Sequence, residues 1–347
     1  MERSVLIVGS FPNSATGSHS VCADLAIRLA ESRWKVVATS TKRGKFSRLL
    51  DMMSTVWFKR DGYAVAQVDV YSGRAFLWAE AVCQALRWLG KPYLLTLHGG
   101  NLPAFAQRWP SRVRRLLRSA AAVTIPSQYL LDNMISYRRD IRLLPNALDL
   151  STYKFRLRGA PQPHLVWLRA FHSIYNPSLA PQVLARLVGD FPGIYLTMIG
   201  PDKGDRSLQA TLKIAKELDV VDRLKLPGPI SKVLVPDWID KGDIFLNTTN
   251  VDNTPVSVLE AMACGLCIVS TNVGGIPYLL ENEHDALLVP PNDPEAMAHA
   301  VRRILTEPGL ARHLSQNARQ KAEQFDWPNI LPKWEALLTY SVNGSPT

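Results

Sequence analysis

The residues that are best suited to bind a ligand or carry out a reaction lie in one stretch, Asp252 to Pro277. Thr254 is a good N-cap residue, Pro255 suits the first position of a helix, and Gly265 stands where helices commonly end. The pattern therefore predicts a helix of about ten residues that starts at Pro255 and carries Glu260. A carboxylate among apolar neighbours is either solvated on a narrow face or buried for a purpose, because burying an unpaired charge is costly.

Glu260 shares a helix face with Val256 and Ser257, which lie four and three positions earlier. The amides of these two residues are among the first in the helix and have no intrahelical acceptor, so they favour an anion such as phosphate. A carboxylate on the same face can accept hydrogen bonds from sugar hydroxyls. Together these groups indicate a nucleotide-sugar site. The alternative is an ordinary crossover helix that carries a solvated acid.

The same stretch resembles the signature of the retaining glycosyltransferases of family 4. That signature has two acids eight positions apart, a helix, a small-residue turn, a strand and a Gly-Gly-Ile-Pro loop. The acids here are Asp252 and Glu260, and the loop is Gly274–Pro277. The first acid is usually Glu in that family, so Asp252 is one methylene shorter. The resemblance implies transfer of a sugar from a nucleotide diphosphate donor to a hydroxyl with retention of configuration.

Composition sets the class of protein. A chain of 347 residues favours two domains, and 47% hydrophobic with 20% charged residues is typical of a soluble globular protein. No apolar run approaches the roughly 18 residues that span a bilayer, and the apolar start is too short for a signal peptide, so we expect a cytoplasmic protein. Cys264 and Cys267 form a lone CxxC at a helix end, which favours core packing over a zinc or redox site.

Parallel sheets with crossover helices are expected because short apolar runs alternate with helical patterns. A proline-containing linker at 156–163 separates two such series, and 327–340 is a further helix. Two doubly wound halves place a ligand in a cleft that faces the carboxyl ends of both sheets. The resemblance implies the GT-B fold: an α/β protein with two Rossmann-like domains. We expect an acceptor domain at 1–158, to which helix 327–340 returns, and a donor domain at 164–326. The predicted strands are Val5–Val8, Val36–Thr39, Val65–Val70, Tyr93–Leu97, Val123–Ile125 and Arg142–Leu144, then Leu165–Leu168, Tyr195–Ile199, Arg223–Leu226, Ile244–Asn247, Ile268–Ser270 and Ala286–Val289.

In the first half, Gly17 and His98 stand where strands end. Gly17 and Ser18 precede the first helix, where a glycine lets the backbone approach an anion, and they resemble the Gly-Gly pair of the family. His98 ends the strand Tyr93–Leu97 and precedes two glycines. The family has a His there, so the resemblance implies that His98 orients the transferred sugar and stabilises charge. The alternatives are a plain turn at Gly17 and a structural histidine.

In the second half, Arg169 ends the strand Leu165–Leu168. It matches the family's arginine that clamps the donor diphosphate, a task for which bidentate guanidinium contacts are suited. The family usually has a Lys a few residues later, where this chain has Asn176. The loop at Pro229 and Ile230 matches the family's contact to the base, for which uracil is commoner than guanine. A structural salt bridge is the alternative for Arg169.

No Asp-x-Asp pair and no cluster with metal-ligand spacing occurs, so we expect neither a metal nor another cofactor. Charge is uneven: residues 1–160 hold 24 basic and 10 acidic residues, and the remainder 16 and 20. Five arginines of Arg108–Arg118 share one arc of a helix opposite Trp109, and Phe46–Phe58 is apolar with basic flanks. Such surfaces suit an anionic membrane, whereas no nucleic-acid module is visible. The alternative is a solvated charged face.

The sequence therefore predicts a metal-independent retaining glycosyltransferase, with UDP a more frequent donor nucleotide than GDP. Its acceptor is a sugar or lipid-linked hydroxyl at the inner membrane face, as in surface-polysaccharide or glycolipid synthesis. A nucleotide-sugar epimerase of the same architecture is the first rival. An inactive nucleotide-sugar-binding homologue is the second, prompted by Asn176 and Asp252.

Overall fold

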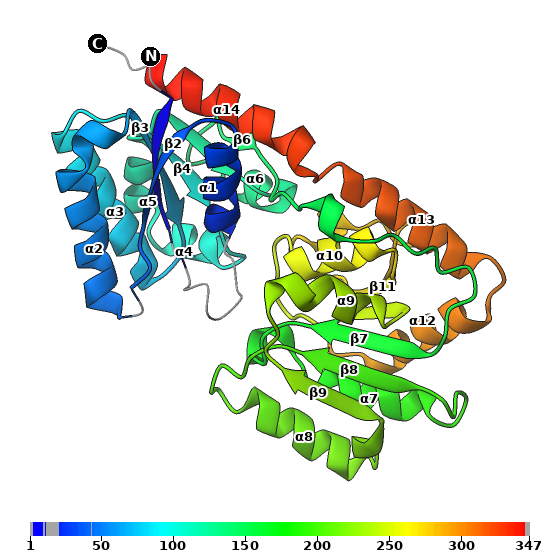
Figure 1. Cartoon of the computed structure of the whole chain (residues 1–347). Coiled ribbons are helices and arrows are strands. Elements are labelled where there is room, and N and C mark those ends of the chain that lie inside the picture. Colours follow the sequence, from blue (N-terminus) through cyan, green and yellow to red (C-terminus); the bar gives the residue numbers. More distant parts are fainter. Residues whose placement is uncertain (1–2, 10, 12–20, 43, 344–347) are drawn as a thin grey trace. The chain divides into compact units, whose positions relative to one another are not determined.

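The computed structural model describes residues 3–343 except 10, 12–20 and 43 (Figure 1). Gly17 and Ser18 lie outside the described residues. The chain divides into two compact units. Unit 1 contains the chain up to Ala147 together with the segment from Trp327 onward, and unit 2 is Leu148–Asp326.

Unit 1 is built on a parallel six-stranded sheet in the order β2-β1-β3-β4-β5-β6. Its central strands are buried on both faces, which explains why they read as continuous apolar runs. The strands are β1 (Ser4–Val8), β2 (Lys35–Thr39), β3 (Val65–Val70), β4 (Tyr93–Leu97), β5 (Ala122–Ile125) and β6 (Arg142–Leu143). Each agrees with its predicted range within one residue at either end.

Helices cover both faces of this sheet. Val5 and Ile7 of β1 pack against α1 (Val21–Glu31) and α14 (Trp327–Asn343), whereas Leu6 and Val8 face the other layer. That layer consists of α2 (Lys45–Phe58), α3 (Arg74–Trp88), α4 (Leu102–Arg108), α5 (Pro110–Arg118) and α6 (Gln128–Met134). Alternate residues of β1 thus pack into the cores on opposite faces of the sheet, because successive side chains of a strand point to opposite faces. The last helix, α14, thus belongs to unit 1.

Unit 2 contains a second parallel sheet, in the order β12-β11-β10-β7-β8-β9. Its strands are β7 (His164–Leu168), β8 (Tyr195–Ile199), β9 (Leu224–Gly228), β10 (Ile244–Asn247), β11 (Cys267–Thr271) and β12 (Leu287–Val289). From β7 the chain runs outward to β9, then returns to the other side of β7 with β10. This is the Rossmann order, and the strand order reverses between β7 and β10.

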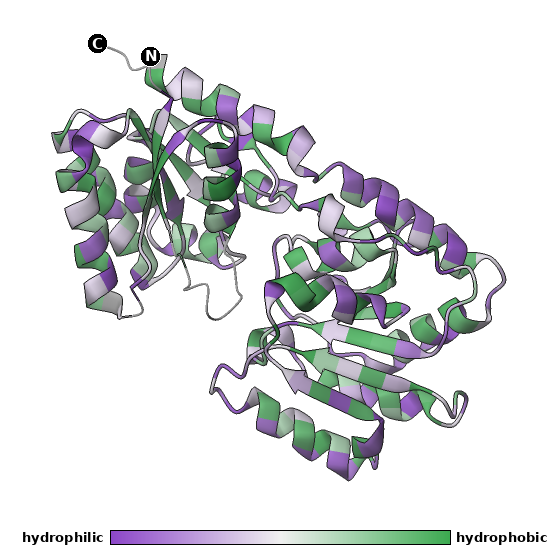
Figure 2. Cartoon of the chain, viewed as in Figure 1, coloured by the Kyte–Doolittle hydropathy of each residue, from purple (hydrophilic) through white to green (hydrophobic). Residues whose placement is uncertain are grey.

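The helices of unit 2 also form two layers. One core packs α7 (Leu179–Leu187), α8 (Ser207–Glu217) and α12 (Pro294–Thr306) on the sheet; the other packs α9 (Val235–Asp240), α10 (Val256–Cys264) and α11 (Ile276–Leu279). Helix α13 (Leu310–Glu323) contributes to both cores through a stripe of small and apolar residues, and Figure 2 shows its remaining surface as hydrophilic. This separation of polar and apolar residues is the helical pattern that the sequence predicted.

The boundary between the units lies earlier than the predicted residue 158. Arg158 is only 1% exposed and donates hydrogen bonds to Asp240 (2.7 Å) and Asp243 (3.3 Å), while Arg156 donates to the same two acids. The segment with the two prolines is therefore bound to unit 2 by ion pairs, of which the pair Arg158–Asp243 is buried. Composition alone marked it as a linker because these partners lie about 80 positions away in sequence.

Candidate functional site

The candidate site of unit 2 forms where the strand order reverses. Arg169 follows the carboxyl end of β7, and the segment from Thr248 to Pro255 follows that of the adjacent strand β10. Parallel sheets bind ligands at such a point because the loops on either side turn away in opposite directions. Both loops also lie near the first residues of α10.

Arg169 is positioned by a backbone hydrogen bond, and its guanidinium pairs with one carboxylate while its Nε has no acceptor among the described residues. Its N–H donates to Ile199 (3.1 Å), its guanidinium carbon lies 4.4 Å from the centre of the Tyr175 ring, and the group forms an ion pair with Asp252. Within the described part of the chain, Nε is buried without a hydrogen-bond partner. Burial lowers the pKa of Arg169, while Tyr175 and Glu260 raise it. An anion bound here would supply the acceptor that is lacking.

Asp252 is fixed by the glycine loop that the sequence singled out. Its Oδ1 accepts from the N–H of Asn253 (2.8 Å), and its backbone oxygen accepts from that of Gly275 (3.0 Å). A Cβ on Gly274 or Gly275 would overlap the backbone oxygens of Asp252 and Asn253, and Gly274 also has a positive φ of 54°. The two glycines are thus needed because one loop passes directly over the other.

Helix α10 begins one residue later than predicted. Pro255 is the N-cap and Val256 the first helical residue, so the assignment of Thr254 as N-cap is wrong. Proline has no side-chain acceptor, so no side chain caps the helix, and the amides of Val256 and Ser257 precede the first intrahelical bond, Val258 N–H to Pro255 O (3.1 Å). The hydroxyl of Ser257 is buried and has no hydrogen-bond partner among the described residues. These donors make the start of α10 an anion site.

Glu260 is buried, so the solvated-acid interpretation is wrong. The residue is 6% exposed, and its Oε1 accepts a hydrogen bond from the hydroxyl of Tyr153 (2.8 Å). Its charge also acts on Arg169. The structure therefore brings Arg169, Asp252, Glu260 and the start of α10 together, as the sequence predicted. Tyr153 was missed, because a hydrogen bond across 107 positions leaves no local pattern.

Asn176 has a backbone role that the family comparison did not indicate. It closes a short 3₁₀ turn, Ser173–Tyr175, in the left-handed conformation (φ 45°), which Asn tolerates better than Lys. Its side chain donates to Asn292 (2.9 Å). The predicted base contact follows β9, where Pro229 is exposed and Ile230 half-buried against the core of unit 2. The contact of Pro229 and Ile230 with the base stays a prediction.

The candidate residue of unit 1 is His98, which is buried directly after β4. Its Nε2 lies 3.0 Å from Asp69 of β3 and its ring stacks on Tyr71, with centroids 5.0 Å apart. Since a carboxylate only accepts, Nε2 carries the hydrogen and Nδ1 is left for a further contact. Gln67 also donates to Asp69 (2.8 Å). Gln67 and Asp69 are polar residues inside the buried strand β3. This pattern in the sequence could have identified Asp69 as a candidate site residue.

The basic surface differs in part from its prediction. Arg108–Arg118 is not one helix: Arg108 ends α4, α5 begins at Pro110, and Trp109 between them is exposed rather than packed. Arg112 is bound in a bidentate ion pair by Glu80, so its charge is balanced within unit 1. On α2, Phe46 (87%) and Phe58 (79%) are exposed. None of the described helices is long and apolar enough to cross a membrane.

The cysteines are structural. All four are buried and outside disulfides, and burial raises the pKa of Cys264 and of Cys267 to about 12. Core packing, as predicted for the CxxC, fits these positions. Across residues 3–343, apart from the undescribed positions, no three His, Cys, Asp or Glu side chains gather as metal ligands would.

Comparison with solved structures shows the fold. Sucrose-phosphate synthase from Thermosynechococcus elongatus superposes with a TM-score of 0.82 at 18% identity, covering 99% of this chain and all of that one. The Anabaena protein HepE, in complex with UDP and glucose, gives 0.79 at 16% identity, covering 97% of this chain and all of that one. The two Rossmann-like units, together with the similarity to these structures, show that the chain has the GT-B fold.

Comparison with protein sequences shows the family. The profile of glycosyl transferases group 1 matches residues 160–321, and that of glycosyltransferase family 4 matches residues 19–152. A D-inositol 3-phosphate glycosyltransferase of Streptomyces bingchenggensis is 25% identical over 198 residues, which are 56% of this chain and 41% of that protein. An exopolysaccharide phosphotransferase of Streptomyces coelicolor is 29% identical over 163 residues, 47% of this chain and 17% of that protein. The matches thus span less than half of these relatives. The chain belongs to the group 1 glycosyltransferases of family 4.

Proposed function

We propose that the protein transfers a sugar from a nucleotide diphosphate sugar, UDP-linked rather than GDP-linked, to a hydroxyl acceptor with retention of configuration. The observation that carries this proposal is the buried Nε of Arg169, which lacks an acceptor, together with the uncapped start of α10, which follows the loop of its ion-pair partner Asp252. Both lie at the strand reversal where a diphosphate would find cation and amide donors together.

The proposed roles follow from the donors and acceptors. Arg169, the amides of Val256 and Ser257, and the Ser257 hydroxyl would bind the diphosphate, whose charge increases as the glycosidic bond breaks. Glu260, whose carboxylate also accepts from Tyr153, would accept from the ribose hydroxyls. No metal is invoked in this scheme, because donors of the chain itself are available for the phosphate charge.

In unit 1, His98 is assigned to the transferred sugar. Asp69 holds the imidazole through Nε2 and Tyr71 supports its face, so the ring is fixed with Nδ1 available to donate when protonated or to accept when neutral. A fixed imidazole can orient a sugar hydroxyl without acting as a nucleophile. The leaving phosphate would then help to deprotonate the acceptor.

We further propose a lipid-linked acceptor at the inner leaflet of an anionic membrane. Phe46, Leu50 and Phe58 on α2 are exposed, and Lys59 and Arg60 follow directly. Exposed aromatic side chains with adjacent cations suit the interface of an anionic bilayer. Co-sedimentation with vesicles should rise with anionic lipid and fall with salt. If the parent ignores anionic vesicles at low salt, a soluble acceptor is the better assignment.

The names of similar proteins support the donor assignment. HepE has been solved with UDP and with UDP-glucose, and several relatives carry the name D-inositol 3-phosphate glycosyltransferase. These names concern other proteins, and they guide the choice of nucleotides in the experiment below.

The test is thermal stabilisation by a panel of nucleotides and nucleotide sugars, followed by kinetics with the best donor. We expect UDP-sugars to raise Tm, and Arg169→Ala to lower kcat more than it raises KM, because the phosphate charge grows in the transition state. Arg186→Ala, on the exposed surface of the same unit, is the control. A pure KM effect would restrict Arg169 to binding. Epimerised donor formed without acceptor would favour the epimerase, and tight binding without turnover would favour the inactive homologue.

A further inference from the structure

A group of arginines lies at the edge of the unit 1 sheet opposite to His98. Arg114 and Arg118 belong to the last turns of α5, directly before β5 begins, and residues 136–140 lead into β6. Both segments therefore lie at the amino ends of strands, whereas His98 follows the carboxyl end of β4. Because the strands are parallel, these are opposite edges of one sheet. The proposed transfer reaction leaves this edge unused.

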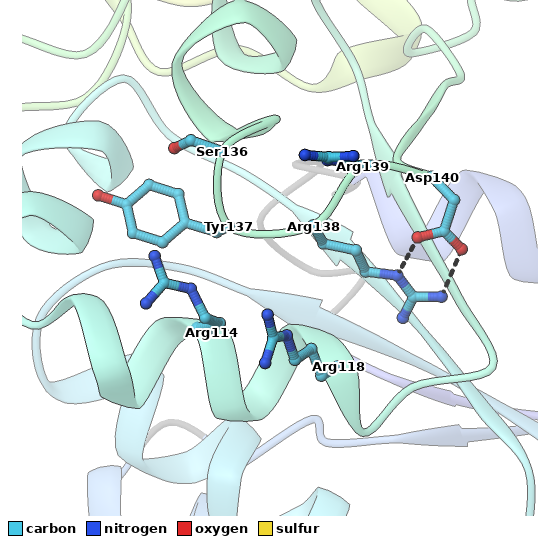
Figure 3. Close-up of a pocket in the computed structure, with 7 residues that line it drawn as sticks. All are labelled: Arg114, Arg118, Ser136, Tyr137, Arg138, Arg139 and Asp140. Carbon is cyan, nitrogen blue, oxygen red and sulfur yellow. Dashed lines mark hydrogen bonds and ion pairs between the residues drawn. The ribbon is translucent and has the colours of Figure 1, made fainter.

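These residues line an open pocket of about 660 Å³, which we name the arginine pocket. Figure 3 shows Arg114 and Arg118 rising from α5 toward the loop that carries Tyr137 and Arg138. The volume lies within the range of small-molecule sites in proteins, about 300–1,000 Å³. The lining residues are Arg114, Arg118, Ser136, Tyr137, Arg138, Arg139 and Asp140.

Arg138 connects the loop of the arginine pocket to α5 and forms an ion pair with Asp140. Arg138 donates to both oxygens of Asp140 (2.7 Å each) and to the backbone oxygens of Leu117 (2.6 Å) and Ala120 (2.7 Å). The hydrogen bonds from Arg138 lower the pKa of Asp140. Asp140 is the only carboxylate among the lining residues, and Arg138 binds both it and the carbonyl oxygens at the end of α5. These acceptors are therefore already used and would otherwise attract the other lining arginines.

Three cations remain uncompensated. Over the described residues, neither Arg114, Arg118 nor Arg139 forms an ion pair, whereas Arg112 on the same helix is paired with Glu80. Arg114 lies over the ring of Tyr137, 5.8 Å from its centre, which fixes this guanidinium in the pocket. Like charges repel, so grouping three of them around one pocket is unfavourable until an anion binds. Guanidinium groups match phosphate oxygens in pairs.

We propose that the arginine pocket binds a phosphate group, separately from the donor site of unit 2. The ligand carries at least one phosphomonoester or diphosphate, since a dianion balances more of the charge than a carboxylate does. Its source is either a soluble phosphate compound or the headgroup of a lipid such as phosphatidic acid. The hydroxyls of Ser136 and Tyr137 supply further hydrogen bonds to the rest of the ligand.

The experiment is amide hydrogen exchange of the full chain with pyrophosphate, and in parallel with phosphatidylcholine vesicles that contain phosphatidic acid. Chloride at matched ionic strength is the salt control. We expect slower exchange in the peptides that cover residues 110–142. These peptides report on the arginine pocket. Pyrophosphate bound at Arg169 would instead slow exchange in peptides of unit 2. Protection by pyrophosphate indicates a soluble ligand, and protection by vesicles alone indicates a lipid.

The decisive variant is Arg114→Gln/Arg118→Gln/Arg139→Gln. Its control, Arg3→Gln/Arg74→Gln/Arg87→Gln, removes three exposed charges from the same unit without touching the pocket. The pocket variant should weaken pyrophosphate or vesicle binding by about tenfold or more, the equivalent of about 1.4 kcal/mol. Equal losses in both variants, or no protection of 110–142 in the parent, would overturn the proposal. Donor binding by unit 2 should be the same in all three proteins, which keeps this test independent of the transferase assignment.

Discussion

The assignment of Glu260 can be tested by separating its charge from its hydrogen bond to Tyr153. Glu260→Gln keeps the size of the side chain and an oxygen that can accept from Tyr153, but it removes the negative charge. A hydrogen bond to a charged group is worth about 1.5–3 kcal/mol, roughly twice a neutral one. We therefore expect kcat/KM for the donor to fall about tenfold in Glu260→Gln, and about 100-fold in Glu260→Ala, which removes the acceptor altogether.

Tyr153→Phe is the matched control because it removes the partner and leaves the carboxylate. The Tyr153 hydroxyl is buried with Glu260 and donates to it over 2.8 Å. Its loss leaves the buried carboxylate with one donor fewer, so the free energy of unfolding should fall by about 1–3 kcal/mol. Donor affinity should change little, because the Glu260 carboxylate keeps the charge that is expected to bind the ribose hydroxyls.

The assay pairs donor titration by calorimetry with urea unfolding of the three variants and the parent. The reasoning predicts that Glu260→Gln loses donor affinity with little loss of stability, and that Tyr153→Phe does the reverse. If Glu260→Gln binds and turns over the donor within twofold of the parent, the ribose assignment fails. If both variants lose only stability, Glu260 is a structural residue of α10.

Four further outcomes are expected. Arg158→Ala should lower the free energy of unfolding by about 3–5 kcal/mol, because it leaves Asp243 buried without its buried partner; urea unfolding measures this, and a loss below about 1 kcal/mol would contradict it. Gly275→Ala should cost about 1–3 kcal/mol, since its Cβ would meet the Asn253 backbone oxygen; an unchanged Tm would refute this close approach. Asn176→Lys should cost about 1 kcal/mol at the left-handed position without slowing turnover, and a large loss of kcat would show that Asn176 contacts substrate. The native protein should resist thiol reagents at pH 8 and release four thiols only on denaturation, because Cys264 and Cys267 are buried with a pKa of about 12; rapid native labelling of either would contradict this.

The fold was predictable because its signals are local. The runs Tyr93–Leu97 and Tyr195–Ile199 are buried on both faces and stand out against helical patterns on either side. Boundaries were less certain where two local rules compete. Thr254 is a good cap by type, yet the helix begins after Pro255, because proline's fixed φ allows it to stand as the extended residue before the helix. Likewise Trp109 reads as part of one amphipathic helix, although the chain breaks there into α4 and α5.

The two sheets, the family motif and the approximate positions of Arg169, Asp252, Glu260 and His98 can be read from the sequence alone. These depend on residue type and short spacing, which the chain carries along its length. The three-dimensional fold determines the partner of each side chain: Tyr153 for Glu260, Asp69 for His98 and Glu80 for Arg112. It also decided that Arg138, by binding Asp140, leaves three arginines around one pocket. Such pairings join residues far apart in the chain, and they depend on how strands and helices stack, which no local pattern records.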